Sequence, residues 1–242
     1  LGEIATISRG GNFQKKDFKD SGVPCIHYGQ IYTQYNLFAD KTFCFITSEV
    51  AKKQKMAVKN DIIMAVTSEN VDDVCKCIAW LGDEDVAVSG HTAIIHHDQN
   101  PKYLSYWFHT AMFFTQKKKL AHGTKVIEVT PTKLSAIRLP VPPLEVQSEI
   151  VRILDKFTEF TTELTAELTA ELTARKKQYE YYRGNLLSFN GTQIPLLELR
   201  SVVKKSCSGS TPTKANSEYY TNGTIPWIRT QDVRFNEITE VD

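Results

Sequence analysis

The chain has 242 residues, 41% of them hydrophobic, and its 29 basic and 28 acidic side chains leave a formal net charge of +1. This size and composition are typical of a globular protein with one large domain or two ordinary ones. No segment approaches the roughly 18 apolar residues of a membrane span and no signal peptide opens the chain, so we expect a cytoplasmic protein without a membrane partner. A protein with so little net charge needs another source of positive charge if it binds DNA.

The cysteines do not predict a metal site. They are odd in number and scattered, and Cys75 and Cys77 are one residue too close for a CxxC zinc motif. We expect free thiols and no metal, and a site that adds His96 and His97 is the weaker alternative. The five cysteines are Cys25, Cys44, Cys75, Cys77 and Cys207.

Residues 1–143 predict an α+β domain rich in short strands. Runs with strand-forming composition recur at Val23–Ile31, Asp61–Thr67 and Val86–His96, with turn residues between them. A helix is then expected from Pro101 to about Lys119, because Asn100 suits the N-cap and proline suits the first helical position. Its apolar face, which we assign to the core, carries Leu104, Trp107, Phe108, Ala111 and Phe114.

A second, much longer helix follows three prolines within residues 139–143, which neither a helix nor an internal strand accommodates. Its pattern runs from about Leu144 to Leu187, and a helix of this length spans about 60 Å. Such a helix should either project from the domain or pair with another helix. The face expected to bury against a partner helix carries Leu154, Phe157, Leu164, Leu168, Leu172, Tyr179 and Tyr182.

Within that helix, residues 162–174 read TELTAELTAELTA, a four-residue unit repeated head to tail. Each unit lengthens a helix by about 6 Å, so the repeat predicts a spacer of defined length. The basic and aromatic residues that follow, Arg175–Lys177 and Tyr179–Arg183, are candidates for a protein-binding face, with a solvated face as the alternative.

Residues 189–242 predict the opening of a second domain related to the first. Leu196–Leu199 echoes Leu1–Ile4, and the run Ile225–Val233 echoes Val23–Ile31. The expected organisation is a domain at 1–143, a spacer helix at 144–188 and a partial second domain at 189–242. Because the chain does not begin with methionine, we expect a fragment.

These features resemble the specificity subunit of type I restriction-modification systems. The segment LPVPPLEVQSEIVRILDKFTEFTTELTAELTAELTARKKQYEYYRGNLLSF (Leu139–Phe189) is similar to the central region of that family, and its TAEL repeat is similar to the type IC branch. The opening LGEIATISRGG (Leu1–Gly11) and the run GTIPWIRTQDV (Gly223–Val233) resemble the start of the family's target recognition domains.

The resemblance implies a bacterial phage-defence protein that recognises DNA and catalyses nothing. Each recognition domain would read one half of a split site in double-stranded DNA, and the helices would set the distance between the halves. Modification subunits would dock on the helices, bind S-adenosylmethionine and methylate adenine. Restriction subunits would use ATP and magnesium, so no cofactor is expected in this chain.

The residues themselves also argue against catalysis. An amino-methyltransferase needs an Asn/Asp-Pro-Pro-Tyr/Phe turn, whereas the Pro-Pro pair within Val141–Leu144 has neither flank. The acidic loop Asp83–Asp85 lacks the neighbouring lysine of a nuclease site. His91, His96 and His97 have no serine or cysteine partner in a nucleophile motif.

Bases in the major groove are read by side chains with paired donors and acceptors, carried on loops of a rigid scaffold. Tyr28 and Gln30 satisfy this requirement at the end of an expected strand, and Lys125 follows a Gly-Thr pair. For each candidate the alternative is an ordinary surface loop or turn residue, and Lys125 is the first choice. The candidate DNA-binding residues are Arg9, Lys15, Lys16, Tyr28, Gln30, Ser68, Asn70, Thr124, Lys125, Thr230 and Gln231.

Only one long helix is present, so we expect two copies to pair antiparallel through residues 144–187 and to favour a palindromic split site. The competing hypothesis is a coiled-coil adaptor whose β-rich domains bind proteins without reading a DNA sequence. A methylation assay on random DNA separates the two.

Overall fold

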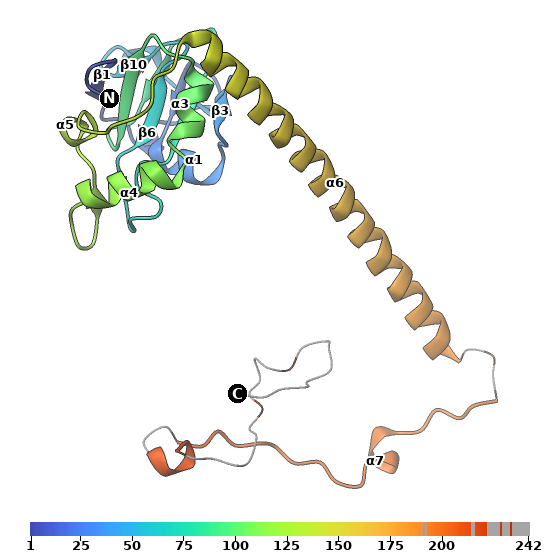
Figure 1. Ribbon diagram of the computed structural model, residues 1–242. Helices are drawn as coiled ribbons and strands as arrows, with labels where there is room; N and C mark the ends of the chain where they lie inside the picture. Colours follow the sequence, from blue (N-terminus) through green and yellow to red (C-terminus); the bar gives the residue numbers. More distant parts are fainter. Residues whose placement is uncertain (190, 192, 214–215, 222–227, 229–232, 234–242) are drawn as a thin grey trace. The chain divides into compact units, whose positions relative to one another are not determined.

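A computed structural model describes residues 1–189, 191, 193–213, 216–221, 228 and 233 (Figure 1). The chain divides into two units, Leu1–Ala174 and Arg175–Asp242. The division falls inside helix α6 (Leu144–Ser188), which continues through it.

The first unit is built on a five-stranded sheet with the order β1-β10-β6-β8-β3. All neighbours are antiparallel except β3 and β8, which run parallel. Strands β6 and β8 are buried on both faces, which explains why their sequences are continuously apolar instead of alternating. The strands are β1 (Ala5–Arg9), β3 (Phe38–Ala39), β6 (Ile62–Ala65), β8 (Cys77–Trp80) and β10 (Thr92–His97).

A four-stranded sheet of order β4-β2-β9-β5 packs on one face of the first sheet. Alternate residues of β6 separate the two cores: Ile63 faces the second sheet, whereas Ile62 and Met64 face the helices. The core between the sheets also includes Ile31 of α1. The elements are β2 (Val23–Ile26), β4 (Cys44–Ile46), β5 (Lys55–Ala57), β9 (Val86–Val88) and α1 (Tyr28–Thr33).

The other face of the five-stranded sheet is covered by helices. Helix α3 (Pro101–Trp107) lies against β8 and β6 (Figure 1), and Leu104 is fully buried there. Short elements complete the domain and confirm its α+β class. They are η1 (Lys15–Asp17), α2 (Ser48–Ala51), α5 (Pro131–Leu134) and a two-stranded pair of β7 (Thr67–Ser68) with β11 (Ile127–Glu128).

The expected strand over Val23–Ile31 is wrong in its second half. Strand β2 ends at Ile26 and helix α1 begins at Tyr28. The His27 Nδ1 accepts a hydrogen bond from the Gly29 N–H at 3.2 Å, and the Gln30 Oε1 accepts one from the His27 N–H at 2.9 Å. These bonds satisfy backbone donors at the helix start, so a capping box converts the end of the strand into a helix.

The expected single helix over 101–119 is two helices, α3 and α4 (Ala111–Leu120). The Thr110 hydroxyl donates to the Trp107 carbonyl at 2.8 Å and accepts from the Phe113 N–H at 3.3 Å, which ends one helix and caps the next. Because the new helix has a different rotation, Phe113 is buried in place of the expected Ala111 and Phe114. Leu104, Trp107 and Phe108 are buried as expected.

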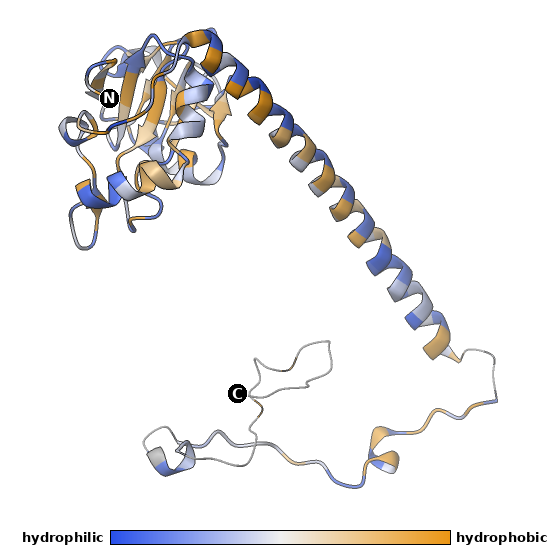
Figure 2. Cartoon of the chain, viewed as in Figure 1, coloured by the Kyte–Doolittle hydropathy of each residue, from blue (hydrophilic) through white to orange (hydrophobic). Residues whose placement is uncertain are grey.

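Helix α6 extends for 45 residues and confirms the long helix expected from the sequence. Gln147 and Val151 are its buried residues, and every residue from Lys156 to Ser188 is exposed. Hydrophobic and hydrophilic residues alternate in bands along its length (Figure 2). The first turns of α6 therefore pack against the domain, and the surface of the helix from Lys156 onward is exposed.

The described part of residues 189–242 contains α7 (Leu199–Val202) and η2 (Ser217–Tyr219) and no strand. The second β-rich domain expected there remains a prediction.

Candidate nucleic-acid interface and helix surface

Arg9 is the last residue of β1, at a tightly packed edge of the first sheet. The Gly10 N–H donates to the Thr92 carbonyl at 3.0 Å and the Gly11 N–H to the Val88 carbonyl at 2.7 Å. A Cβ on Gly10 would collide with the Ser89 carbonyl, so only glycine allows this approach. The segment after β1 is thereby fixed against the β9–β10 turn, residues 89–91.

Tyr28 reaches the same turn from α1. Its N–H donates to the Ser89 hydroxyl at 2.9 Å, and Ser89 is buried. The Tyr28 and His91 rings lie with their centroids 4.9 Å apart, within the range of an aromatic pair. A helix start and a strand turn, separated by about 60 positions in sequence, therefore present two polar aromatic side chains together.

The β7–β11 pair brings two further predicted segments together. Ser68 of β7 is opposite Ile127 of β11, so the loop that contains Thr124 and Lys125 ends beside Ser68. Gly123 closes this loop at a φ of +111°, where an added Cβ would meet the Val126 carbonyl. Thr124 and Lys125 are both exposed.

Two open hollows lie on this surface and share Tyr28 and His91 as a common wall. The first, of about 710 Å³, also includes Arg9, Asn12 and Gln14. The second, of about 380 Å³, is lined by Ser68, Asn70, Val126 and other residues. We call the two hollows and their rim the polar face. Its lining comes from five separate stretches of the chain: 9–14, 27–32, 67–73, 89–91 and 126.

Four predicted residues thus line the polar face: Arg9 lines the first hollow, Ser68 and Asn70 line the second, and Tyr28 lines both. Lys15 and Lys16, in η1, directly follow Gln14 of the first hollow, and Thr124 and Lys125 directly precede Val126 of the second. Thr230 and Gln231 lie outside the described residues.

Some predicted side chains on or beside this face already have partners. The Gln30 amide accepts from the His27 N–H and donates to the Gln34 Oε1 at 3.0 Å. The Asn70 Oδ1 accepts from the Asp73 N–H at 2.7 Å, and its Nδ2 donates to the Asp73 carboxylate at 2.8 Å. A contact of these residues with DNA remains a prediction, whereas the structure shows both amides bonded to neighbouring parts of the protein.

Ion pairs neutralise part of the acidic charge near the polar face. Arg9 pairs with Glu128 at 2.8 Å, and Lys76 pairs with Asp73 at 2.6 Å and lowers the pKa of that carboxyl. Burial lowers the pKa of His27, and the positive charge of Lys15 lowers it further. The lowered pKa favours the uncharged form of His27, which lines the first hollow.

Sequence reasoning missed His91 and Asn12. The available signal was the polar turn Ser89-Gly90-His91 between two buried strands, in which His91 is exposed. Within the described part of the chain, the His91 ring has no hydrogen-bond partner.

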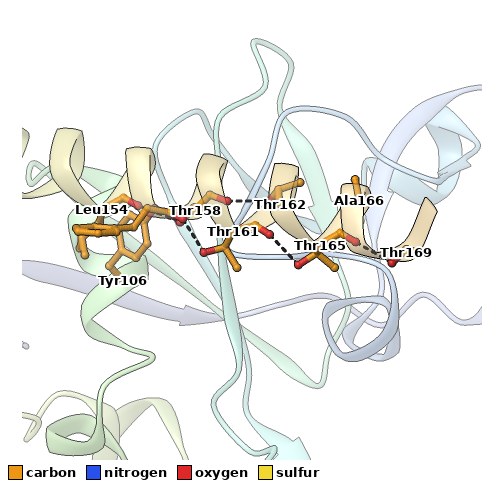
Figure 3. Close-up of a pocket in the computed structure, with 9 residues that line it drawn as sticks. Tyr106, Leu154, Thr158, Thr161, Thr162, Thr165, Ala166 and Thr169 are labelled. Atoms are coloured by element: carbon orange, nitrogen blue, oxygen red, sulfur yellow. Dashed lines mark hydrogen bonds between the residues drawn. The ribbon is translucent and has the colours of Figure 1, made fainter. Parts of the chain in front are cut away.

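A second surface follows helix α6. Tyr106 of α3, with Leu154, Phe157 and Thr158 of α6, begins an apolar groove of about 680 Å³. The groove continues along Thr161, Thr165 and Thr169, which stand in a row along the helix (Figure 3).

The threonines of this groove satisfy their own hydroxyls. Thr161, Thr165 and Thr169 each donate to the carbonyl four residues earlier, at 2.7 Å in all three cases (Figure 3). Their methyl groups then form the outer surface, so a packing partner need not supply hydrogen bonds. This row of threonines therefore offers a packing partner an apolar surface.

The predicted interface residues of α6 are uncovered in the structure. Leu164, Leu168 and Leu172 are 56%, 59% and 55% exposed. Phe157, Tyr179 and Tyr182 are also exposed, whereas Leu154 is half-buried at the base of the groove. Exposed large apolar residues at helical spacing are unfavourable in water and mark an interaction surface.

The described residues contain no group of three or more His, Cys, Asp or Glu side chains able to hold a metal ion. All five cysteines are free thiols. Within the same residues no helix is both long and apolar enough to cross a membrane.

The fold and the polar face can now be compared with known proteins. The family described as type I restriction modification DNA specificity domain matches residues 1–174. The chain belongs to this family. It is also 36% identical over 242 residues to the type I restriction enzyme EcoR124I/EcoR124II specificity subunit of Escherichia coli, an alignment with 96% of this chain and 54% of that protein.

A putative type I restriction enzyme specificity subunit of Haemophilus influenzae, S.HindORF215P, is 43% identical over 112 residues, or 43% of this chain and 29% of that protein. The chain therefore spans about half the length, or less, of these relatives. These relatives are named as specificity subunits, in agreement with the expected non-catalytic class. The type IC branch stays a prediction.

The fold is shared with a solved structure described as the structural basis of complex assembly and conformational transition of the type I R-M system. The TM-score is 0.55 at 20% identity, over 74% of this chain and 42% of the other.

Proposed function

We propose that this chain recognises one half of a split DNA site through the polar face of its first domain. The observation that carries the proposal is the convergence of candidate residues from separate segments on one surface. Arg9, Tyr28, Ser68 and Asn70 line it, and basic side chains at positions 15, 16 and 125 lie at its rim. Basic rim residues suit phosphate contacts, and the polar lining suits base edges.

A domain that reads DNA at a defined distance from a second site needs a rigid connection to its spacer. The base of α6 provides one. The fully buried Gln147 amide donates to the Gln99 Oε1 and to the Pro142 carbonyl, both at 2.8 Å, and accepts from the Asn100 N–H at 3.0 Å. Since burying an amide without partners is costly, these bonds specify one seating of the helix.

A charged contact about two turns later fixes the direction of the helix. Asp155 of α6 binds the Lys102 ammonium at 2.6 Å and accepts from the Tyr106 hydroxyl at 2.9 Å. Lys102 and Tyr106 both belong to α3, which is buried against the sheet. The domain and the first turns of α6 therefore form one body, and the TAEL units beyond them act as the spacer.

The exposed face of α6 supports association of two copies, antiparallel, through this helix. Fully burying a leucine contributes about 1.5–3 kcal/mol, and the leucines at 164, 168 and 172 are a little over half exposed. Six such side chains in a pair contribute roughly 5–10 kcal/mol, comparable to the cost of association of about 4–15 kcal/mol. The exposed Phe157, Tyr179 and Tyr182 add the surplus that a stable pair requires.

Charge favours the antiparallel direction. Glu159, Glu163, Glu167 and Glu171 make the middle of the helix acidic, and Arg175–Lys177 make the following turn basic. In an antiparallel pair over residues 144–187, positions 175–177 of each copy lie opposite positions 154–156 of the other, one helical turn from Glu159, whereas a parallel pair would place the two basic turns together.

Modification subunits that bind S-adenosylmethionine, and restriction subunits that use ATP and magnesium, complete the proposed assembly in the bacterial cytoplasm. The small net charge supports this division, because a chain of net charge +1 supplies few phosphate contacts alone.

Methylation by the reconstituted complex tests the proposal. The chain is combined with the modification subunits of its own system and with random DNA, and methylated adenines are mapped by sequencing. A bipartite motif with a fixed gap is the expected result. A complex that assembles and yet methylates without any motif would support the coiled-coil adaptor instead.

A further inference from the structure

We propose that His91, Tyr28 and Asn12 are the side chains that read base edges on the polar face. The inference rests on the proposed function and assigns roles within it. Gln30 and Asn70, which the sequence favours for base reading, become structural supports. The rim lysines become phosphate contacts.

First, the polar side chains of this face differ in whether their hydrogen-bonding groups already have partners within the protein. The Gln30 amide is bonded within helix α1 and its caps, and the Asn70 amide is bonded to Asp73. The Arg9 guanidinium is bonded to Glu128 and to the Gly90 carbonyl. Within the described part of the chain, the His91 ring, the Tyr28 hydroxyl and the Asn12 amide have no such partner. A group without an internal partner can bond a base without first breaking a bond in the protein.

The second step is rigidity. The turn that carries His91 is held on every side by backbone bonds. The Ser89 N–H donates to the Ile26 carbonyl at 3.1 Å, the Thr92 N–H to the Ser89 carbonyl at 3.1 Å, and the Val66 N–H to the His91 carbonyl at 2.9 Å. The Arg9 Nε donates to the Gly90 carbonyl at 2.8 Å. A reading group needs such a fixed base, because its discrimination depends on placement within fractions of an ångström.

The third step is position. His91 and Asn12 are exposed and Tyr28 is half-buried, so all three can reach a ligand. Tyr28 and His91 stand between the two hollows, and Asn12 lines the first of them. Both hollows share this place, whereas Lys15, Lys16 and Lys125 follow or precede residues that line only one hollow, as expected for phosphate contacts that surround a base contact.

The fourth step is chemistry. A neutral histidine ring offers one donor and one acceptor, a tyrosine hydroxyl offers both, and an asparagine amide can bond adenine through two atoms. These groups match the edges of base pairs in the major groove, which display donors and acceptors in a distinct order for each pair. The predicted ligand is therefore a short run of base pairs in one half-site.

Sequence preference measured with single variants tests the assignment. His91→Ala, Tyr28→Phe and Asn12→Ala are each combined with the modification subunits, and methylation is scored over a library of all half-site sequences. Each variant is expected to lose discrimination at one or two half-site positions, on the order of 10-fold, with other positions unchanged. His91→Gln, which keeps a donor and an acceptor, should change the preferred base at the affected position.

Two controls make the result decisive. Lys125→Ala should weaken binding to all sequences alike, and Gln30→Ala should lower the melting temperature through loss of the α1 cap without relaxing one position. If all three reader variants keep the wild-type preference at every position, the inference is overturned while the proposed function stands. If the wild-type complex itself shows no motif, both are overturned.

Discussion

At the residue scale, side chains on the polar face differ by whether the protein already uses their hydrogen bonds. Sequence reasoning placed Tyr28, Ser68 and Lys125 in this region, because polar and basic residues in turns between buried strands are visible in the sequence. It could not show that the Gln30 amide is used at the α1 cap, because the strand-like run before it conceals the helix start. The tertiary contact of Tyr28 with His91 has no local sequence signal.

Lys125 gives the clearest test of phosphate binding. Lys125→Ala should reduce affinity for all DNA sequences alike and lower the salt dependence of log Kd by about 0.9, the value for one phosphate contact. Lys59→Ala is the matched control. Lys59 pairs with Asp83 and precedes the start of β6, whereas the Lys125 loop ends beside Ser68, which follows the end of β6. The two lysines therefore belong to opposite ends of that strand. Titrations at several salt concentrations measure both, and an equal slope for Lys125→Ala and the wild type would contradict the role.

Three histidines predict acid sensitivity. Burial lowers the folded-state pKa of His27, His97 and His109 below the ordinary value of 6.5, so the unfolded chain binds protons more readily than the folded one. The free energy of unfolding should have its full value above about pH 7 and should decrease as the pH drops below 6.5. Urea unfolding at pH 7.5 and 5.5 measures the difference.

His27→Asn serves as the control for that profile. Asparagine can cap α1 and does not titrate, so this variant should show a smaller loss between the two pH values. A wild-type midpoint that does not change with pH would contradict the assignment.

At the element scale, α6 was predicted to within a residue at both ends and α3–α4 was not. A long helix whose pattern continues over 45 residues is recorded in local sequence, because nothing interrupts it before Gly184. The break after Trp107 depends on a single threonine cap, and apolar residues continue through it, so periodicity alone could not locate it.

The exposed leucines of α6 should determine the association state. Leu168→Lys places a charge in the proposed interface and is expected to weaken dimerisation by at least about 10-fold, equivalent to 1.4 kcal/mol. Ala170→Lys is the matched control, since it lies about 200° around the helix from position 168. Light scattering over a concentration series measures both variants, and a wild-type protein that stays monomeric at micromolar concentration would contradict the pairing.

At the scale of the whole molecule, the structure joins a specificity domain to the long helix α6 through a bonded junction. The junction depends on Gln147 and Asp155, whose partners Gln99 and Lys102 lie some 50 residues earlier, and neither pair was predictable from local sequence. The family of the domain and the long helix were predictable, because the TAEL repeat and the proline-rich entry to the helix carry them, whereas the spacer role stays a prediction.

Removal of one spacer unit tests the account most directly. Deleting Thr165–Leu168 shortens α6 by about 6 Å, close to two base-pair steps of 3.4 Å, and keeps the repeat in register. The methylation motif of the variant complex, mapped beside that of the wild type, should have identical half-sites and a shorter gap. Changed half-sites, or an unchanged gap in a folded and active complex, would contradict the claim that α6 sets how far apart this protein reads DNA.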